Sequence, residues 1–383
     1  MHRPIPLATR PFSALQHPRE VIRQFTPNWF AAVMGTGVLA LALAQLPPGW
    51  SVMHGLAKGM WVLAVLLFGL FTLLYAARWV LFFDEARRIF GHSTVSMFIG
   101  TIPMALATLI NGFVVFALAD AGAGALPWLQ GLWWLDVALS LACGVGIPFL
   151  MFTRQQHSID QMTAVWLLPV VAAEVAAASG GLLAPHLLAP AAQFGMLITS
   201  YVLWAFSVPV AFAILTILML RMALHKLPHE SMAASSWLAL GPIGTGALGM
   251  LVLGGDAPGI FAAAGVLPGV GTMIDGLGLV SAVILWGMGL WWMLLAMLIT
   301  VRYLRSGMPF NLGWWGFIFP LGVYTLATLR LGSVLHLSFF TWCGQGLVAC
   351  LAMLWALVMT RTVRGAWRGE LFVSPCIAAA RGQ

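Results

Sequence analysis

Long apolar stretches alternate with short polar segments along almost the whole chain. Each stretch holds about 20 residues, which lets an α-helix cross a bilayer core of about 30 Å. The period-two alternation of a membrane β-barrel is absent from stretches such as GLGLVSAVILWGMGLWWMLLAMLITV. The pattern therefore predicts ten membrane-spanning helices, over residues 27–46, 60–82, 94–119, 131–152, 163–183, 193–220, 232–253, 276–301, 312–331 and 337–359.

The composition agrees with an integral membrane protein. Of the 383 residues, 61% are hydrophobic and only 8% are charged, whereas soluble domains carry about 25% charged residues. The first 26 residues lack the apolar core and the small-residue cleavage site of a signal peptide. We therefore expect an N-terminal arm over residues 1–26, one transmembrane domain over 27–360 and a C-terminal tail over 361–383.

The lysines and arginines predict how the chain is oriented in the membrane, because short cytoplasmic loops accumulate these residues. Of 18 lysines and arginines, sixteen lie in the terminal segments or at and after the ends of even-numbered spans, and only Lys58 and Arg330 lie on the other side. Both termini are therefore predicted to lie in the cytoplasm. The net charge of +7 is then an orientation signal and not a nucleic-acid-binding surface.

Glycine or proline interrupts every odd-numbered span near its middle, whereas most even-numbered spans are continuous apolar runs. The interruptions recur about every seventy residues, and a fixed period indicates a repeated structural unit. Here the unit is a helical hairpin, with one interrupted helix and one regular helix, used five times. The interruptions lie at Gly35, Gly37, Pro103, Pro169, Pro242 and Pro320.

Interrupted helices are expected on the inside of the protein. A backbone group released by proline is tolerated at membrane depth only against protein or a water-filled cavity. The odd-numbered helices are therefore predicted to form an inner ring, and five helices around one axis enclose a channel. Close packing between helices is the alternative role for the glycines.

Three stretches give the chain a resemblance to a known family: FTPNWFAAVMGTGVLALAL at 25–43, LPVVAAEVAAASGG at 168–181 and WWGFIFPLGVYTLATLRLG at 314–332. From about residue 24 to 360, the chain resembles the tellurite-resistance/dicarboxylate transporter family. That family includes the bacterial tellurite-resistance protein TehA, fungal malate permeases and sulfite efflux pumps, and the slow-type anion channels of plants. The first stretch is closer to the malate and sulfite branch than to TehA.

The resemblance implies an all-α membrane fold of ten helices, arranged as five hairpins with quasi-five-fold order around a central pore. It also implies a homotrimer in a plasma membrane, here a bacterial inner membrane. Family members close the pore with a phenylalanine that directly precedes a proline of the ninth helix, which is Phe319 in this sequence. Phe317 would point to another face of the helix and is the weaker candidate.

The wall of the predicted pore is nearly uncharged, because the odd-numbered helices carry no lysine or arginine at membrane depth. Such a wall binds anions weakly, which suits conduction, since an ion must leave each site as readily as it enters. For each polar side chain, packing against a neighbouring helix is the alternative role. The polar lining is predicted to include Thr36, Thr101, Thr108, Asn111, Thr245 and Thr325.

Three further residues are candidates for function. Glu174 lies in the middle of the fifth span, where an acid is costly and by default marks function. We expect it to couple transport to protons or to sense pH, the alternative being a protonated acid hydrogen-bonded between helices. Arg330 and His336 flank a predicted external turn, where positive charge attracts anions to the pore mouth or anchors the interface.

The sequence contains no convincing catalytic motif: HKLPHE is not HExxH, and GxSxG is absent. Asp256 falls in a predicted external loop, LGGDAPG, and the four cysteines show no CxxC spacing. We therefore expect no enzyme activity, no metal site and no cofactor.

The predicted function is transport of small anions across the bilayer. Sulfite or another small inorganic monovalent anion is favoured, because the spans show no buried cation for a dicarboxylate. A proton-coupled carrier of C4 dicarboxylates such as malate is the alternative.

Overall fold

The computed structural model describes residues 11–47, 51–267, 269–375 and 377. The first ten residues of the predicted arm, and Cys376 and residues 378–383 of the predicted tail, lie outside this part. In the described residues the chain is almost entirely helical and forms no strand. Ten of its helices are long and apolar enough to cross a membrane, which confirms the predicted number of spans.

Five of these helices lie on the inside of the bundle. Each begins as a short 3-10 helix and continues as an α-helix. The 3-10 helices span Pro27–Trp29, Val95–Gly100, Ala164–Leu167, Glu230–Trp237 and Leu312–Phe317. The α-helices that follow them are α2 (Phe30–Ala44), α5 (Thr101–Phe116), α8 (Leu168–Leu183), α10 (Leu240–Ala264) and α12 (Ile318–Leu335).

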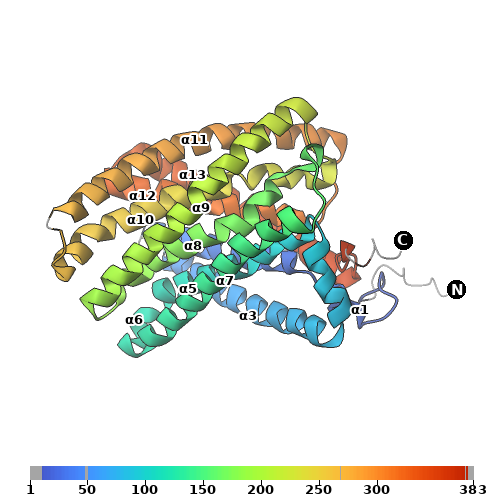
Figure 1. The fold of residues 1–383 in the computed structure, drawn as a ribbon, viewed down its shortest axis with the longest axis horizontal. Coiled ribbons are helices and arrows are strands. Elements are labelled where there is room, and N and C mark those ends of the chain that lie inside the picture. Colours follow the sequence, from blue (N-terminus) through green and yellow to red (C-terminus); the bar gives the residue numbers. More distant parts are fainter. Residues whose placement is uncertain (1–10, 48–50, 268, 376, 378–383) are drawn as a thin grey trace.

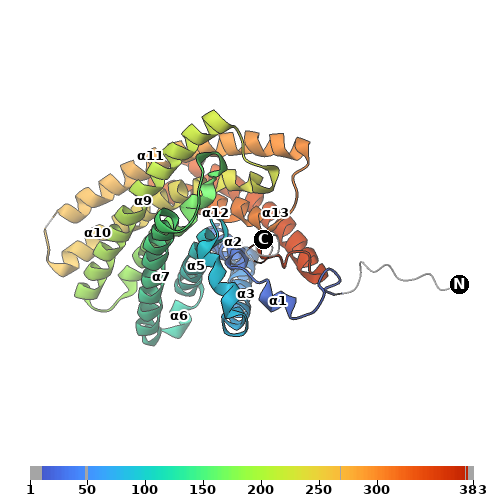
Figure 2. The ribbon, with the colours of Figure 1, turned by 45° about the vertical axis from the view of Figure 1, so that its right-hand side comes forward.

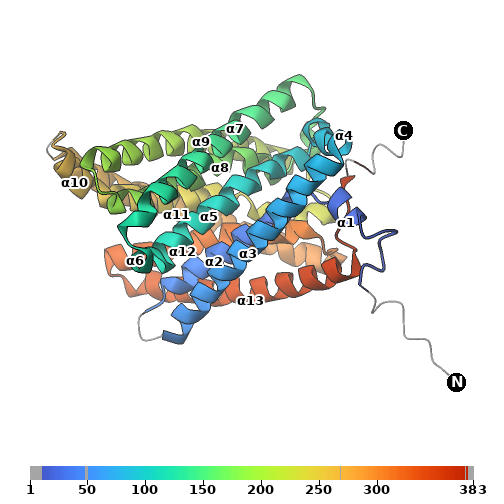
Figure 3. The same cartoon turned by 90° about the horizontal axis from the view of Figure 1, so that it is seen from below.

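The other five helices are longer and lie outside. They are α3 (Ser51–Leu81), α7 (Leu126–Thr153), α9 (Pro190–His225), α11 (Val270–Ser306) and α13 (Ser338–Arg368). Figure 3 shows α3 and α7 on the near face, with α2 and α8 behind them. Three short helices complete the order: α1 (Glu20–Arg23), α4 (Phe83–Ala86) and α6 (Leu118–Ala121).

The helices pair as five consecutive hairpins, α2 with α3, α5 with α7, α8 with α9, α10 with α11 and α12 with α13. The inner helices also contact one another in the order α2, α5, α8, α10, α12, and α12 returns to α2. These contacts close a ring of five inner helices. Five-fold symmetry of this ring stays a prediction.

Burial separates the two sets of helices. In the most apolar stretch of each inner helix, 56–94% of the residues are buried, whereas the corresponding values for the outer helices are 17–39%. Large apolar side chains such as Leu66 on α3 and Ile284 on α11 are exposed and suited to lipid. The prediction that odd-numbered helices form the inner ring is confirmed.

The four prolines of the repeat occupy the first turns of the inner α-helices. Pro169 is the second residue of α8, and Pro103, Pro242 and Pro320 are the third residues of α5, α10 and α12. The missing proline N–H therefore falls at the junction with the 3-10 helix, where an α-helical donor has no partner in any case. The interruptions are changes of helix type near one end, and not breaks in mid-span.

Gly35 and Gly37 differ from the prolines, because α2 runs through both without interruption. A Cβ atom at Gly35 would lie 2.7 Å from the Trp315 ring, and one at Gly37 would lie 2.7 Å from Thr108 Oγ1. These glycines let α2 approach its neighbours in the ring. Close packing, the alternative role, therefore describes them better than a break.

The predicted external loop LGGDAPG is also helical, because α10 continues through Asp256 and Pro258 to Ala264. Glycines allow α10 and α11 to pack backbone to backbone here. A Cβ atom at Gly278 would lie only 2.6 Å from the carbonyl oxygen of Met250. Asp256 therefore belongs to an inner helix and not to a loop.

Both ends of the described chain pack together at one end of the bundle, which we call the termini side (Figures 1 and 2). Phe12 N donates to the carbonyl of Trp367 at 2.7 Å, and Ser374 N donates to Gln24 Oε1 at 2.8 Å. The rings of Trp29 and Phe372 stack at 5.1 Å. The arm and the tail thus form one structure beside the start of α2.

An ion pair attaches the arm to α4, and it makes the arm sensitive to acid. Arg23 Nη2 lies 2.6 Å from Glu85 Oε1, and the guanidinium holds the pKa of Glu85 below its ordinary value of 4.5. Because the folded pKa is lowered, this stabilisation is present at neutral pH and is lost as the pH falls below about 4.5. We expect less than about 1 kcal/mol from this partly exposed pair.

Thermal unfolding of wild type and Glu85→Gln checks this expectation. The difference in Tm should be largest at pH 7 and should shrink as the pH falls below about 4.5. Asp84→Asn is the matched control, since the Asp84–Arg87 pair is largely exposed. A difference for Glu85→Gln that does not depend on pH would contradict the assignment.

Candidate functional site

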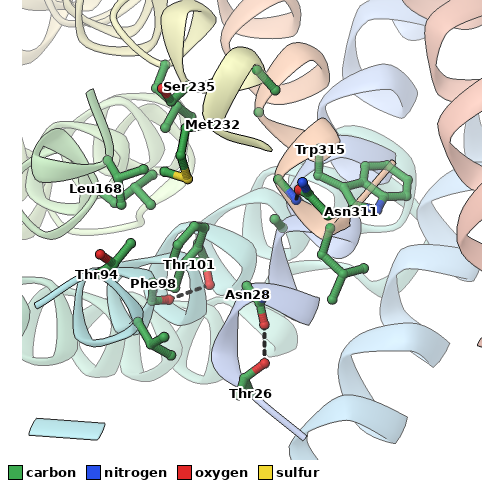
Figure 4. Close-up of a pocket in the computed structure, with 18 of the residues that line it drawn as sticks. Thr26, Asn28, Thr94, Phe98, Thr101, Leu168, Met232, Ser235, Asn311 and Trp315 are labelled. Carbon is green, nitrogen blue, oxygen red and sulfur yellow. Dashed lines mark hydrogen bonds between the residues drawn. The ribbon is translucent and has the colours of Figure 1, made fainter. Parts of the chain in front are cut away.

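A cavity of about 400 Å³ lies inside the ring on the termini side. Every inner element contributes to its wall, through residues such as Met34, Thr101, Leu168, Gly241 and Phe319. Figure 4 shows the labelled side chains from these separate segments pointing around one common space. The cavity therefore lies where the axis of the ring meets the termini side.

Polar side chains around the cavity come mainly from the 3-10 helices and the residues just before them. Asn311 accepts from Gly313 N at 2.8 Å and donates to the carbonyl of Ser231 at 2.9 Å, so it joins two neighbouring elements. Thr101 Oγ1 donates to the carbonyl of Pro27 at 2.8 Å and so joins α5 to the 3-10 helix Pro27–Trp29. Thr26 donates to Asn28 at the start of the first element. The wall offers hydroxyl and amide groups in a mostly apolar surface.

Phe319 lies in the cavity wall together with Pro320, and its ring is 5% exposed. Phe317 does not line the cavity and packs against Trp237 and Trp314, with ring centroids 5.8 and 5.7 Å away. Deeper along α12, Val323 and Leu326 are buried. Phe319 therefore borders the point where the open space gives way to packed side chains.

The segment after α13 covers part of the cavity through Glu370, Leu371, Val373 and Pro375. Glu370 is the one charged residue among the described residues of the wall, and no lysine or arginine lines it. The cavity is thus close to neutral, with one carboxylate at its termini-side edge.

Comparison with known proteins decides the family. Residues 24–363 match the voltage-dependent anion channel family. The chain belongs to this family. A sulfite efflux pump of Arthroderma benhamiae is 37% identical to the chain over 352 residues, which cover 92% of the chain and 93% of the pump.

Two more distant relatives match over similar lengths. A malic acid transport protein of Schizosaccharomyces pombe is 26% identical over 360 residues, 90% of the chain and 78% of that protein. An uncharacterised transporter of Methanocaldococcus jannaschii is 29% identical over 355 residues, 92% of the chain and 96% of that protein. The chain is thus similar to proteins named for different anions.

Within this family member, the cavity collects only part of the predicted pore lining. Thr101, Phe319 and Pro320 line the described wall. Thr36 instead accepts from Trp355 Nε1 of α13 at 3.0 Å, which is a packing role. The predicted residues that lie outside the cavity wall are Gly35, Thr36, Gly37, Pro103, Thr108, Asn111, Pro169, Pro242, Thr245 and Thr325.

Glu174 also lies outside the cavity wall. Its carboxyl is fully buried between α8 and α9, where Oε2 accepts from Ser207 Oγ at 3.2 Å and Oε1 has no partner among the described residues. Arg330 and His336 lie far from the cavity, at the other end of α12. His336 is exposed and caps that helix in the left-handed region, whereas Arg330 is half-buried.

Sequence reasoning missed the polar residues at the starts of the inner elements, including Asn28, Ser231 and Asn311. A signal for them exists, because each directly precedes or opens an apolar run, as in FTPNWF and FNLGWW. Residues that cap helices are often threonine or asparagine for local reasons. That these residues surround one cavity depends on the ring.

Proposed function

We propose that the protein transports small anions along the axis of the inner ring, with Phe319 as the gate. The observation that carries the proposal is a cavity lined by all five inner elements and bordered by Phe319 where packed side chains begin. An aromatic ring at such a constriction blocks an ion sterically and by excluding water. Membership of the voltage-dependent anion channel family supports anions as the transported species.

The wall chemistry supports a small, weakly held anion. Hydroxyl and amide donors such as those of Thr26, Thr101 and Asn311 replace part of a hydration shell without a fixed positive charge. Such sites release an ion as readily as they accept it, which fits a conductive path. A dicarboxylate, by contrast, calls for buried cations, and the described cavity wall contains none.

Sulfite in its monovalent form, hydrogen sulfite, or another small inorganic monovalent anion is the proposed substrate. The relatives named as sulfite efflux pumps share up to 37% identity with the chain, against 26% for the malic acid transport protein. Purified protein in liposomes should carry sulfite, nitrate and chloride faster than malate, relative to protein-free liposomes. Malate flux that equals or exceeds sulfite flux would contradict the proposed preference.

A proton-coupled carrier of C4 dicarboxylates is the second candidate, and Glu174 is the observation that favours it. A buried carboxyl without a cationic partner is costly at membrane depth unless it holds a proton. If that proton takes part in transport, Glu174→Gln should flatten the dependence of flux on pH. Ser207→Ala is the control, because it removes the hydrogen bond to Glu174 and leaves the acid.

Flux through both variants should be measured from pH 5.5 to 8 in liposomes. An unchanged pH profile for Glu174→Gln would assign Glu174 a packing role and count against proton coupling. A flattened profile together with net malate uptake would favour the carrier.

The proposed setting is a plasma membrane, with both termini in the cytoplasm and three copies per assembly. The distribution of lysine and arginine supports the orientation, and the family resemblance supports the trimer. Protease access to a C-terminal tag in sealed cells tests the orientation. Mass measurement of the detergent-solubilised protein tests the trimer.

A further inference from the structure

Besides Glu174, four polar side chains of the inner α-helices have a buried atom without a partner among the described residues, and all four lie beyond Phe319 from the cavity. Ser179 Oγ on α8 and Thr245 Oγ1 on α10 are buried and make no hydrogen bond. Asn111 Oδ1 on α5 and Arg330 Nε on α12 are also buried and without a partner. Each costs free energy unless something else occupies the space that it faces.

Other buried hydroxyl groups of the spans behave differently. They donate to a backbone carbonyl, usually one turn back in their own helix, as serine and threonine ordinarily do in helices. Ser179 and Thr245 therefore differ from most buried hydroxyl groups of the spans. The hydroxyls that donate in this way include Thr36, Thr108, Ser200, Thr325, Thr328 and Thr362.

Helical periodicity places the unpartnered groups on the faces that line the cavity. Arg330 lies 11 residues after Phe319, and Ser179 lies 11 residues after Leu168. Eleven residues make about three helical turns, so each polar residue lies within about 20° of the earlier residue around the axis of its helix. Asn111 follows Met104 by seven residues, again about 20° away. Because Phe319, Leu168 and Met104 line the cavity, the three polar residues face the same axis.

The three residues also lie at a similar depth. Arg330 and Ser179 each lie ten residues beyond the first-turn proline of their helix, Pro320 and Pro169, and Asn111 lies eight beyond Pro103. At 1.5 Å per residue, this places them about 12–15 Å past the prolines. Two neighbouring helices of the ring, α5 and α8, and a third helix across it, α12, thus present polar groups to one level of the axis.

Burial is lower for several inner-helix residues at or near that level, although Ser179 itself is fully buried. Asn111 and Arg330 are half-buried, and so are Leu182, Leu248 and Val252, which share faces with cavity-lining residues of α8 and α10. Between this level and the cavity, Val175, Thr245 and Val323 are buried. The described side chains therefore close the ring in its middle, and several residues of the inner helices are less buried on the side away from the termini.

We propose that Arg330, Ser179 and Asn111 form an anion-binding site on the far side of the Phe319 constriction, with Thr245 as the next hydroxyl along the path. The guanidinium supplies charge and directed donors, and the hydroxyl and amide supply neutral donors, which together suit a small oxyanion. This site deepens the proposed function, since it rests on the same path. It would load or release the anion at the end opposite the cavity.

Charged residues near Arg330 are expected to change the affinity of the site for an anion. Asp256 on α10 is near enough to interact with Arg330, yet no ion pair within 4 Å joins it to Arg330 among the described residues. Asp256 and Asp275 both interact with Tyr201 of α9, whose OH is also buried without a partner. Lys58, on the same side of the bundle, is exposed and pairs with Asp120 at 3.6 Å.

Binding is measured as the rise in Tm of the detergent-solubilised protein with sodium sulfite, at constant ionic strength kept with gluconate. Arg330→Gln should raise the apparent Kd about tenfold or more, because a charge-assisted hydrogen bond is lost. Ser179→Ala should raise it by a smaller factor, and Lys58→Gln should leave it unchanged. Asp256→Asn should lower it, because a competing negative charge is removed.

The sign of the Asp256→Asn effect separates binding from structure. If Arg330 served only to offset Asp256, both variants would destabilise the protein. The apparent Kd for sulfite would then not shift in opposite directions in the two variants. An apparent Kd that is the same in Arg330→Gln and Lys58→Gln, or a wild type that sulfite does not stabilise, would overturn the site. Binding without any flux in liposomes would instead contradict the proposed function and leave the site standing.

Discussion

Replacement of Phe319 by alanine should increase anion flux through liposomes by about tenfold or more, which corresponds to a barrier lowered by about 1.4 kcal/mol or more. The phenyl ring borders the cavity at the point where packed side chains begin. Alanine removes the ring from the axis and leaves Pro320 and the helix junction in place. Water and a partly hydrated anion can then enter the segment between the cavity and Thr245.

Phe317→Ala is the matched control for this experiment. Phe317 is as deeply buried as Phe319 and lies two residues away, but it packs against Trp237 and Trp314 outside the cavity wall. It should reduce stability without raising flux per folded protein. Equal flux in wild type and Phe319→Ala, or an increase of the same size in Phe317→Ala, would contradict the gate.

Gly100→Ala should destabilise the ring strongly. A Cβ atom at Gly100 would lie 2.4 Å from the carbonyl oxygen of Leu168 and 3.1 Å from Pro169 Cα. These are backbone atoms of α8, so no side chain can move aside and the two elements must separate. We expect a loss of about 3 kcal/mol or more from such overpacking, seen as a Tm lower by roughly 5 °C or more.

Gly287→Ala provides the comparison, because a Cβ atom there would meet nothing within 4 Å on α11. Alanine favours a helix over glycine, so this variant should keep or slightly raise the Tm. A Tm for Gly100→Ala equal to that for Gly287→Ala would show that the ring tolerates wider spacing than the contacts indicate.

The membrane spans were predictable because few backbone structures are stable in lipid. A backbone in hydrocarbon must bond internally, so a long apolar run becomes a helix. Prolines in hydrocarbon must also lie against protein, and the odd-numbered helices were therefore correctly predicted to lie inside. The prediction of an external loop at LGGDAPG was wrong, although its glycines and proline are typical of a loop. There Gly254 and Gly278 allow α10 and α11 to pack closely, and the packing overrides the local preference for a turn.

The candidate site was less predictable than the fold. Phe319 was identified through the family resemblance, which implies a phenylalanine before the proline of the ninth helix, and Thr101 was identified as a polar residue in an inner span. Position alone cannot separate Thr36, which bonds to Trp355 of α13, from Thr245, which has no partner. The contribution of Leu371 and Val373 to the cavity wall depends on the fold of the tail against the arm, which no local pattern encodes.

Transport along the axis of the inner ring is the central proposal, and a chemical block of that path tests it most directly. The protein carries Phe319→Ala, with Cys143, Cys343, Cys350 and Cys376 replaced by alanine, and a single new cysteine at Thr245 on the axis. The control places the cysteine at Ile284 on the exposed face of α11, where the side chain is 67% exposed.

Proteoliposomes are treated with a maleimide, washed, checked for modification by mass spectrometry and assayed for sulfite flux. Modification of Thr245→Cys should abolish the flux, and modification of Ile284→Cys should leave it unchanged. Full modification of Thr245→Cys with undiminished flux would contradict a path along the ring axis.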